Sequence, residues 1–175
     1  MRNIHKILLI LPILLSGLAF GEPNHGQHAQ HGKQMMNGSG KFAMGMKPIL
    51  AEYLKIHGAL MAGKTDDVKS LSTRIVALAK SLDPHSVSGE HADHYKHVPM
   101  NLTKYANAIG KSKDLAAARE SFKKLSQPMA MWVGMAKPKG YSVMFCPMVK
   151  ASWVQKDGET QNPYDDKMPR CGSKV

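Results

Sequence analysis

The stretch from Val68 to Leu82 reads VKSLSTRIVALAKSL, and it decides the fold class. Its apolar residues return every three or four positions, which is the period of one face of an α-helix. These apolar positions are Val68, Leu71, Ile75, Leu78 and Leu82. Thr65 before the pattern can cap a helix, and Asp83-Pro84 after it ends one. The stretch therefore predicts an amphipathic helix that buries one face in a core.

Three further segments have the same helical period, at residues 48–62, 94–110 and 115–133. Pro99 lies inside the second of these segments, where it either kinks a helix or begins one, because proline cannot donate a backbone hydrogen bond. Asp114 precedes the third segment and is a suitable N-cap residue. Four amphipathic helices joined by short connections predict a mainly α fold, a four-helix up-down-up-down bundle.

The C-terminal residues 141–175 have a different character from the helical segments. The alternation over residues 140–145 indicates a strand, and the prolines and glycines that follow indicate turns. Because this part of the chain has few apolar residues, we expect an irregular cap on the bundle that can include a short hairpin. Both cysteines of the chain, Cys146 and Cys171, lie in this cap.

Each cysteine of the cap has a methionine close by in the sequence. The four sulfur residues are Cys146, Met148, Met168 and Cys171. If the two ends of the cap meet, two thiolates and two thioethers form a soft ligand set that favours Cu(I) or Ag(I) over Zn(II). The alternative is a disulfide, which is common in exported proteins and would here stabilise the fold by about 3 kcal/mol. The spacing leaves both alternatives open.

Residues 1–21 have the composition of a secretory signal peptide. Arg2 and Lys6 precede the apolar run Ile7–Leu15, and small residues lead to a cleavage point near Gly21. We therefore expect a periplasmic or secreted protein. No later apolar run approaches the ~20 residues needed to cross a bilayer, so no transmembrane segment is expected in the mature chain. Export also makes nucleic acid an unexpected partner, despite the formal charge of +11.

Histidine and methionine are abundant, with 9 His and 13 Met among 175 residues. Much of this excess lies in residues 22–46, which contain few branched apolar residues and are expected to form a disordered arm. Its candidate ligands are His25, His28, His31, Met35, Met36, Met44 and Met46. Imidazole and thioether groups on a flexible tether suit copper or Ag(I), so the arm is predicted to collect metal. A polar linker without a metal function is the alternative.

A second group of histidines lies at the start of the third helical segment. His91, His94 and His97 recur every third residue, and His94 and His97 would share one face of a helix. Two imidazoles in this arrangement can bind one Zn(II) or Cu(II) ion. An exposed polar helix start without metal has the same pattern, so this group is a secondary candidate.

Several short motifs in the C-terminal part of the chain carry a family resemblance. They are LAAARESFKKLS at residues 115–126, FCPM at 145–148, SWVQ at 152–155, NPY at 162–164, and KM at 167–168 followed by CG at 171–172. With these motifs the chain resembles the DUF3347 family over residues 47–172, and residues 47–175 are the predicted domain. The resemblance implies a small exported helical domain. Such domains also occur fused to periplasmic adaptor subunits of copper/silver-type heavy-metal efflux systems.

The resemblance also implies a role around metal export, and two functional hypotheses follow. The leading one is an exported protein that binds a soft ion such as Cu(I), sequesters or delivers it in the cell envelope, and has an efflux adaptor as a partner. The other is an interaction module that docks on an envelope efflux assembly, with Cys146–Cys171 as a structural disulfide. No Ser-His-Asp spacing, Gly-rich phosphate loop or helix-borne carboxylate pair supports an enzyme.

Overall fold

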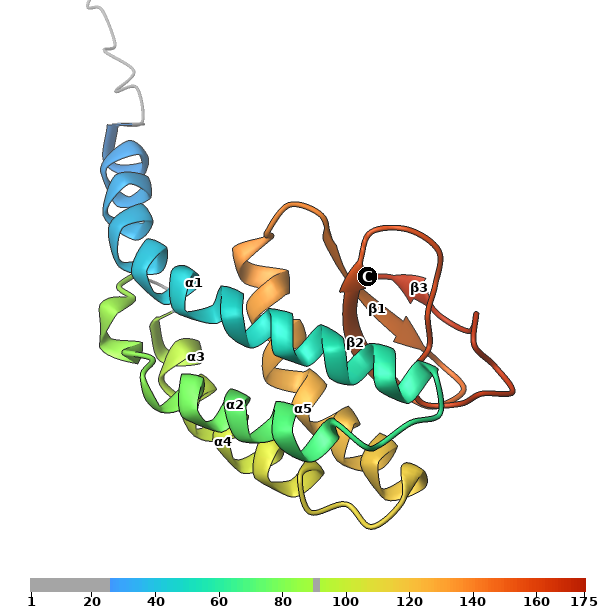
Figure 1. Cartoon of the computed structure of the whole chain (residues 1–175). Helices are drawn as coiled ribbons and strands as arrows, with labels where there is room; N and C mark the ends of the chain where they lie inside the picture. The colour runs from blue at the N-terminus through green and yellow to red at the C-terminus, as the bar shows by residue number, and fades with distance from the viewer. Residues whose placement is uncertain (1–25, 90–91) are drawn as a thin grey trace, which may run out of the picture.

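The structure is a computed structural model that describes residues 26–89 and 92–175, with side chains from Gly40 onward. Its helices are α1 (Gly26–Met61), α2 (Val68–Lys80), α3 (Ala92–Lys96), α4 (Val98–Ile109) and α5 (Leu115–Ala136), with the 3₁₀ turn η1 at Pro84–Ser86. Its strands are β1 (Tyr141–Cys146), β2 (Ala151–Lys156) and β3 (Ser173–Lys174). The prediction of a mainly helical fold with four main helices is confirmed (Figure 1). The predicted signal peptide, His25 and His91 lie outside the described residues.

Helix α2 forms where the apolar period predicts it, and its apolar face is buried between α1 and α4 (Figure 1). The buried apolar positions on this face are Val68, Leu71, Ile75 and Ala79. Asp67, and not the predicted Thr65, occupies the N-cap position. The N–H of Val68 donates to the Thr65 carbonyl, so Thr65 belongs to the turn before the helix. After the helix, Asp83 accepts a hydrogen bond from the N–H of His85 and starts η1.

The third predicted helix is divided in two by Pro99. Proline has no N–H for the carbonyl of Tyr95, and its ring disfavours a continuous helix, so α3 ends and α4 begins on either side of His97. His97 keeps a nearly helical conformation, with φ −93° and ψ −9°. The two helices therefore follow each other with a break of one residue.

Helix α5 starts and ends with local signals. Asp114 Oδ1 accepts a hydrogen bond from the N–H of Ala117 at 2.7 Å, so Asp114 is the N-cap as predicted. At the other end Lys137 is left-handed (φ 45°), and its N–H donates to the Val133 carbonyl at 2.8 Å. The large buried side chains of the helix are Phe122, Leu125, Met129 and Trp132. Through this face α5 contacts α1, α4 and the strands β1 and β2.

Helix α1 is longer than the sequence predicts, and this corrects the boundary of the N-terminal arm. The helix runs from Gly26, although a disordered arm is predicted over residues 22–46. Phe42 is 1% exposed and Met46 is 0% exposed, so both belong to the core. The Phe42 ring packs edge-on against Tyr95, with 5.0 Å between the ring centroids. The prediction of a disordered arm is therefore wrong from Phe42 to Met46, and Met46 is a packing residue.

Pro48 lies inside α1, and the burial around it explains why the helix continues through it. A proline inside a helix costs roughly 3 kcal/mol. Met46, Ile49 and Leu50 beside it are all buried, and burial of such side chains contributes roughly 1.5–3 kcal/mol each. Tertiary packing therefore outweighs the local preference, and a prediction from local pattern starts this helix too late.

The C-terminal cap contains a three-stranded antiparallel sheet with the order β2-β1-β3. Strands β1 and β2 form the expected hairpin, in which Tyr141 pairs with Lys156 and Cys146 pairs with Ala151. Strand β3 is an addition that the sequence pattern does not predict. Trp153 of β2 is fully buried, and the sheet packs on α5 at one side of the bundle (Figure 1).

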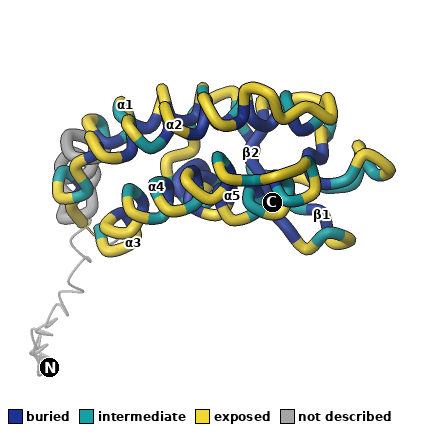
Figure 2. The backbone as a smooth tube through the Cα atoms, turned by 60° about the horizontal axis from the view of Figure 1, so that its bottom comes forward, coloured by how far each residue is buried: buried dark blue, intermediate teal, exposed yellow. Residues whose placement is uncertain are grey.

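The core runs through the helices and the cap without interruption. Figure 2 shows buried residues, in dark blue, along α1, α2, α4 and α5 and along β1 and β2. These side chains form one hydrophobic cluster that extends from Phe42 to Tyr164. Within residues 26–89 and 92–175, none of the helices is both long enough and apolar enough to cross a membrane.

We predict that Met46→Ala destabilises the domain by about 2–5 kcal/mol, because it leaves a cavity in the core. Met44→Ala removes the same group from a side chain that is 63% exposed, and it should change the free energy of unfolding by less than about 0.5 kcal/mol. Urea unfolding followed by tryptophan fluorescence measures both values. Equal effects of the two substitutions would contradict the placement of Met46 in the core.

Candidate functional site

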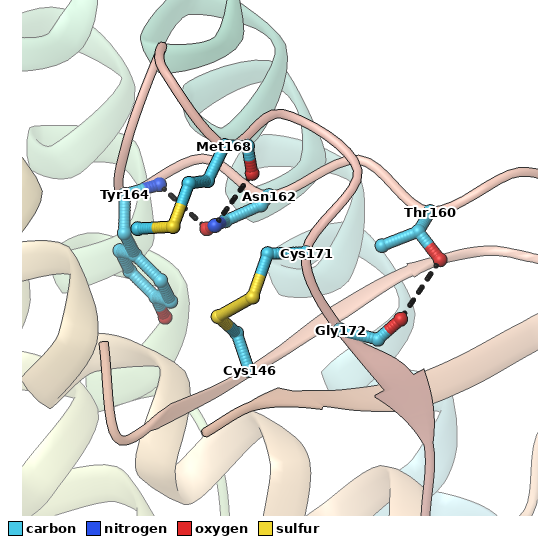
Figure 3. The surroundings of a disulfide bond; sticks show 7 residues. All are labelled: Cys146, Thr160, Asn162, Tyr164, Met168, Cys171 and Gly172. Carbon is cyan, nitrogen blue, oxygen red and sulfur yellow. Dashed lines mark hydrogen bonds between the residues drawn. A yellow bond between two sulfur atoms is a disulfide. The ribbon is translucent and has the colours of Figure 1, made fainter. Parts of the chain in front are cut away.

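The two cysteines of the cap are joined by a disulfide, with 5.5 Å between their Cα atoms (Figure 3). Cys146 ends β1 and is completely buried, while Cys171 precedes β3 and is partly buried. Because β1 and β3 are neighbouring strands, the bridge ties the last segment of the chain to the central strand of the sheet. Of the two alternatives that the sequence leaves open, the disulfide is the one present.

The two methionines of the predicted sulfur set are placed differently from the cysteines. Met148 lies in the turn between β1 and β2 and is 70% exposed. Met168 is partly buried, and Figure 3 shows its side chain pointing toward Tyr164. The structure thus brings the two cysteines together, leaves Met148 in solvent, and keeps Met168 in the loop next to the bridge. As long as the cysteines are bonded to each other, neither can serve as a thiolate ligand.

Asn162 holds the loop that leads from β2 to Cys171 (Figure 3). It is 2% exposed; its side-chain amide donates to the Met168 carbonyl at 3.0 Å, and its side-chain oxygen accepts from the N–H of Tyr164 at 3.1 Å. Its backbone N–H donates to the Pro169 carbonyl at 2.9 Å. Hydrogen bonds from one buried residue therefore fix this loop, and with it the approach of Cys171 to the sheet.

Gly172 lets the chain pass close to the sheet directly after the bridge. Its φ of +136° is a conformation that residues with a side chain rarely adopt. A Cβ at this position would lie 2.5 Å from the Trp153 ring and 3.2 Å from the Phe145 carbonyl oxygen. The Gly172 carbonyl accepts a hydrogen bond from Thr160 Oγ1 at 3.2 Å (Figure 3). The glycine of the Cys-Gly pair is therefore a steric requirement of the path that brings Cys171 to the sheet.

A chain of buried hydroxyl groups connects the helices with the cap. Tyr53 Oη on α1 lies 2.7 Å from Ser126 Oγ on α5, which lies 3.0 Å from Tyr164 Oη in the cap. Tyr53 Oη accepts from the N–H of Val154 at 3.1 Å, and Tyr164 Oη donates to the Ser152 carbonyl at 2.6 Å. Because Tyr164 has a single hydroxyl hydrogen and a carbonyl only accepts, Tyr53 donates to Ser126 and Ser126 donates to Tyr164. All three hydroxyls are thereby satisfied.

The two tyrosines of this chain remain neutral across the physiological pH range. Burial raises the pKa of Tyr53 and the pKa of Tyr164 well above the ordinary value of 10. Tyr53 is 0% exposed and stacks on Phe122, with 4.7 Å between the ring centroids. Both tyrosines therefore act as structural hydrogen-bonding groups and not as acids.

His57 is a buried histidine on α1 that faces the cap. It is 3% exposed, and its Nε2 donates a hydrogen bond to the Gln161 carbonyl at 2.9 Å. Burial lowers the pKa of His57 below its ordinary value, and the hydrogen bond to the carbonyl opposes this shift. The helical pattern places His57 on the apolar face of its segment. Its partner lies 104 residues further along the chain, and no local signal reveals that contact.

The other predicted ligands are spread over the described structure. His28, His31, Met35 and Met36 lie on α1, but their side chains are outside the described part. Met44 is exposed, whereas Met46 is in the core. His94 on α3 and His97 before α4 are exposed. Among the described residues, no group of three or more His, Cys, Asp or Glu side chains is arranged to hold a metal ion.

The fold and the cap define a small, mainly helical domain closed by a disulfide-tied β-sheet. A family model described as "Protein of unknown function (DUF3347)" matches residues 49–139, more than half of the chain. The chain therefore belongs to the DUF3347 family, as its motifs predict. The match runs from within α1 to just after α5; it is shorter than the predicted 47–172, and the cysteine motifs lie beyond it. No curated protein and no solved structure matches the chain.

We predict that Cys146→Ser/Cys171→Ser lowers the free energy of unfolding by about 3 kcal/mol, because the bridge restricts the unfolded chain. Urea unfolding of the oxidised protein and the variant measures the difference. Met148→Ser in the exposed turn is the control and should change the value by less than about 0.5 kcal/mol. Alkylation followed by intact-mass measurement should find no free thiol in the native protein. Two alkylated cysteines before any reductant is added would contradict the bridge.

We also predict that His57 makes the domain less stable below about pH 6.5. The unfolded chain protonates this histidine near its ordinary pKa of 6.5, whereas the folded chain, in which that pKa is lowered, keeps it neutral. Below that pH the unfolded state therefore binds more protons. The stability is complete above pH 6.5 and falls on acidification by up to about 1.4 kcal/mol per pH unit.

His57→Gln removes the titrating group and should flatten the pH dependence of urea unfolding between about pH 5 and 7. His85→Gln is the matched control, because His85 is an exposed histidine on η1. If His57→Gln retains the wild-type slope, the assignment of acid sensitivity to His57 fails.

Proposed function

We propose that this protein is an exported soft-metal-binding protein that sequesters or delivers a Cu(I)- or Ag(I)-like ion in the cell envelope. Its partner in this proposal is the periplasmic adaptor of a heavy-metal efflux system, and it has no enzymatic role. The observation that carries the proposal is the distribution of histidine and methionine. Three methionines between Phe42 and β2 are buried and serve packing: Met46, Met129 and Met144.

Phe42 is the first buried side chain of the described core. The proposed N-terminal ligands all precede it in the sequence, within residues 25–36. They are His25, His28, His31, Met35 and Met36. Imidazole nitrogen is a borderline ligand and thioether sulfur is a soft one, so their combination favours Cu(I) and Ag(I) over hard cations.

The sulfur residues of the cap enter this proposal in their reduced form. A dithiol reductant exchanges with the bridge, which gives free thiols on Cys146 and Cys171 and a disulfide on the reductant. A Cu(I) ion then replaces both thiol protons, which are released to solvent. Met168 in the adjoining loop and Met148 in the exposed turn supply thioether sulfur to the same ion. The cap is thus a site of the reduced protein, whereas the N-terminal ligands serve in either redox state.

A second candidate is favoured by the disulfide itself: an interaction module that docks on an envelope efflux assembly. The bridge and the hydrogen bonds of Asn162 fix the cap, and a fixed surface loses little conformational freedom on binding. The up-down-up-down order of the four main helices is part of this proposal, and it is supported by the packing of α1 on α2, α2 on α4, and α4 on α5.

The test is a Cu(I) titration against a chromogenic chelator, with and without a dithiol reductant. It compares residues 22–175 with a variant lacking residues 22–39 and with Cys146→Ser/Cys171→Ser. The deletion stops at residue 39 because Phe42 and Met46 belong to the core. We expect the deletion to lower the affinity of the oxidised protein at least about ten-fold, and the double substitution to remove only the binding gained on reduction.

A full-length variant is the matched control for the deletion. It replaces His25, His28 and His31 by Gln and Met35 and Met36 by Leu, and it should bind Cu(I) as weakly as the deletion. The proposal would be overturned if the deletion and the full-length variant both bound Cu(I) as tightly as the wild type, with and without the reductant. Co-purification with an efflux adaptor that survives loss of the cysteines and of residues 22–39, without bound copper, would support the docking candidate instead.

A further inference from the structure

A shallow hollow lies where the end of α2 meets the start of α4. Its volume is about 410 Å³, and it is lined by Ala79, Lys80, Pro99, Met100, Thr103 and Lys104. Figure 1 shows this helix pair on the side of the bundle away from the sheet. No residue of the cap lines the hollow, so it is separate from the disulfide and its methionines.

Part of the lining of the hollow is apolar and adaptable. Met100 is 60% exposed there, although burial of a methionine side chain is favourable. Its unbranched, polarizable side chain can adjust to differently shaped partners. Pro99 and Thr103 are partly exposed and add apolar surface around it. An apolar side chain that enters the hollow would therefore remove Met100 from water.

The lining of the hollow also carries positive charge. Neither α2 nor α4 contains an acidic residue, and Lys80 and Lys104 stand at the hollow, both exposed. Within the described part of the chain neither lysine forms a salt bridge; Lys104 Nζ lies 5.6 Å from the centroid of the Tyr105 ring. Arg74 of α2 differs, because Glu52 of α1 neutralises it at 2.8 Å. Within the described residues, no salt bridge therefore offsets the positive charge at the hollow.

We propose that this hollow binds an acidic segment of a partner protein. The partner inserts one apolar side chain over Met100 and places carboxylates beside Lys80 and Lys104, so that charge and shape are both complementary. An anionic bilayer surface is the weaker fit, since peripheral membrane binding uses apolar residues that project from the protein and not a concave site. The interaction goes beyond metal binding and uses a surface separate from the cap on which the docking candidate rests.

The probe is a pair of fluorescein-labelled peptides of equal length, with leucines spaced three and four residues apart. One peptide carries Glu at its other positions and the second carries Lys. Fluorescence anisotropy measures their binding to residues 22–175 in a buffer with a metal chelator, so that metal sites do not contribute. We expect only the Glu peptide to bind, and Lys80→Glu/Lys104→Glu to weaken its binding at least about ten-fold.

Two further variants separate a defined hollow from general attraction between opposite charges. Lys124→Glu/Lys139→Glu makes the same change in net charge at exposed positions away from the hollow and should alter binding less than about two-fold. Thr103→Trp fills the hollow without changing the charge and should weaken binding as strongly as the lysine substitutions. Urea unfolding of each variant confirms that the fold is retained.

Three results would overturn the proposal. The first is an equal loss of binding in the Lys124→Glu/Lys139→Glu control, and the second is unchanged binding in Thr103→Trp. The third is a preference for phosphatidylglycerol vesicles over the Glu peptide that depends on Lys80 and Lys104, which would make the surface a membrane site. Each result leaves the Cu(I) titration unaffected, so failure of this inference and failure of the metal-binding proposal are distinguishable.

Discussion

The buried chain of hydroxyls from Tyr53 through Ser126 to Tyr164 is the interaction on which the rest of the structure depends. It joins α1, α5 and the loop after β2 inside the core, and each hydroxyl is satisfied only when all three elements are in place. A buried hydroxyl that loses its partner costs about 1–3 kcal/mol. The two ends of the chain are backbone groups of β2, the N–H of Val154 and the carbonyl of Ser152. The chain therefore fixes the position of the hairpin on the bundle.

The disulfide follows from this placement of the hairpin. The register of β1 and β2 fixes Cys146 opposite Ala151, and Asn162 folds the following loop so that Cys171 returns to the sheet. These contacts do not involve the sulfur atoms, so the backbone brings the cysteines together independently of the bond between them. Reduction would then leave two thiols close to each other in an ordered cap. In an unstructured tail the two thiols would separate after reduction. Binding of one metal ion to both of them would then cost the entropy of closing the loop.

The sequence predicts the elements whose signals are local. The apolar spacing of α2, the Asp114 cap of α5 and the break at Pro99 all follow from neighbouring residues. Phe42 lies in a glycine- and lysine-rich stretch without a clear apolar period, and its contact with Tyr95 on another helix is not visible in the local sequence. The candidate site, too, is predicted from the sequence only in part. Its sulfur residues are visible in the sequence, but the approach of Cys171 to Cys146 depends on the loop held by Asn162 and on the pairing of β3 with β1. The two residues of β3 carry no strand pattern.

The most buried and the most exposed of the described methionines differ in chemistry. Met46, Met129 and Met144 are at most 5% exposed and fill the core. Met44, Met100 and Met148 are between 60% and 70% exposed, and packing does not account for them. An exposed thioether is open both to a soft ion and to a partner protein, so the groups around it decide between the two. Imidazoles and further thioethers favour a metal ion. The ammonium groups of Lys80 and Lys104, which line the hollow with Met100, repel a cation and attract carboxylates. The α2–α4 hollow is therefore assigned to a protein partner although a methionine lines it.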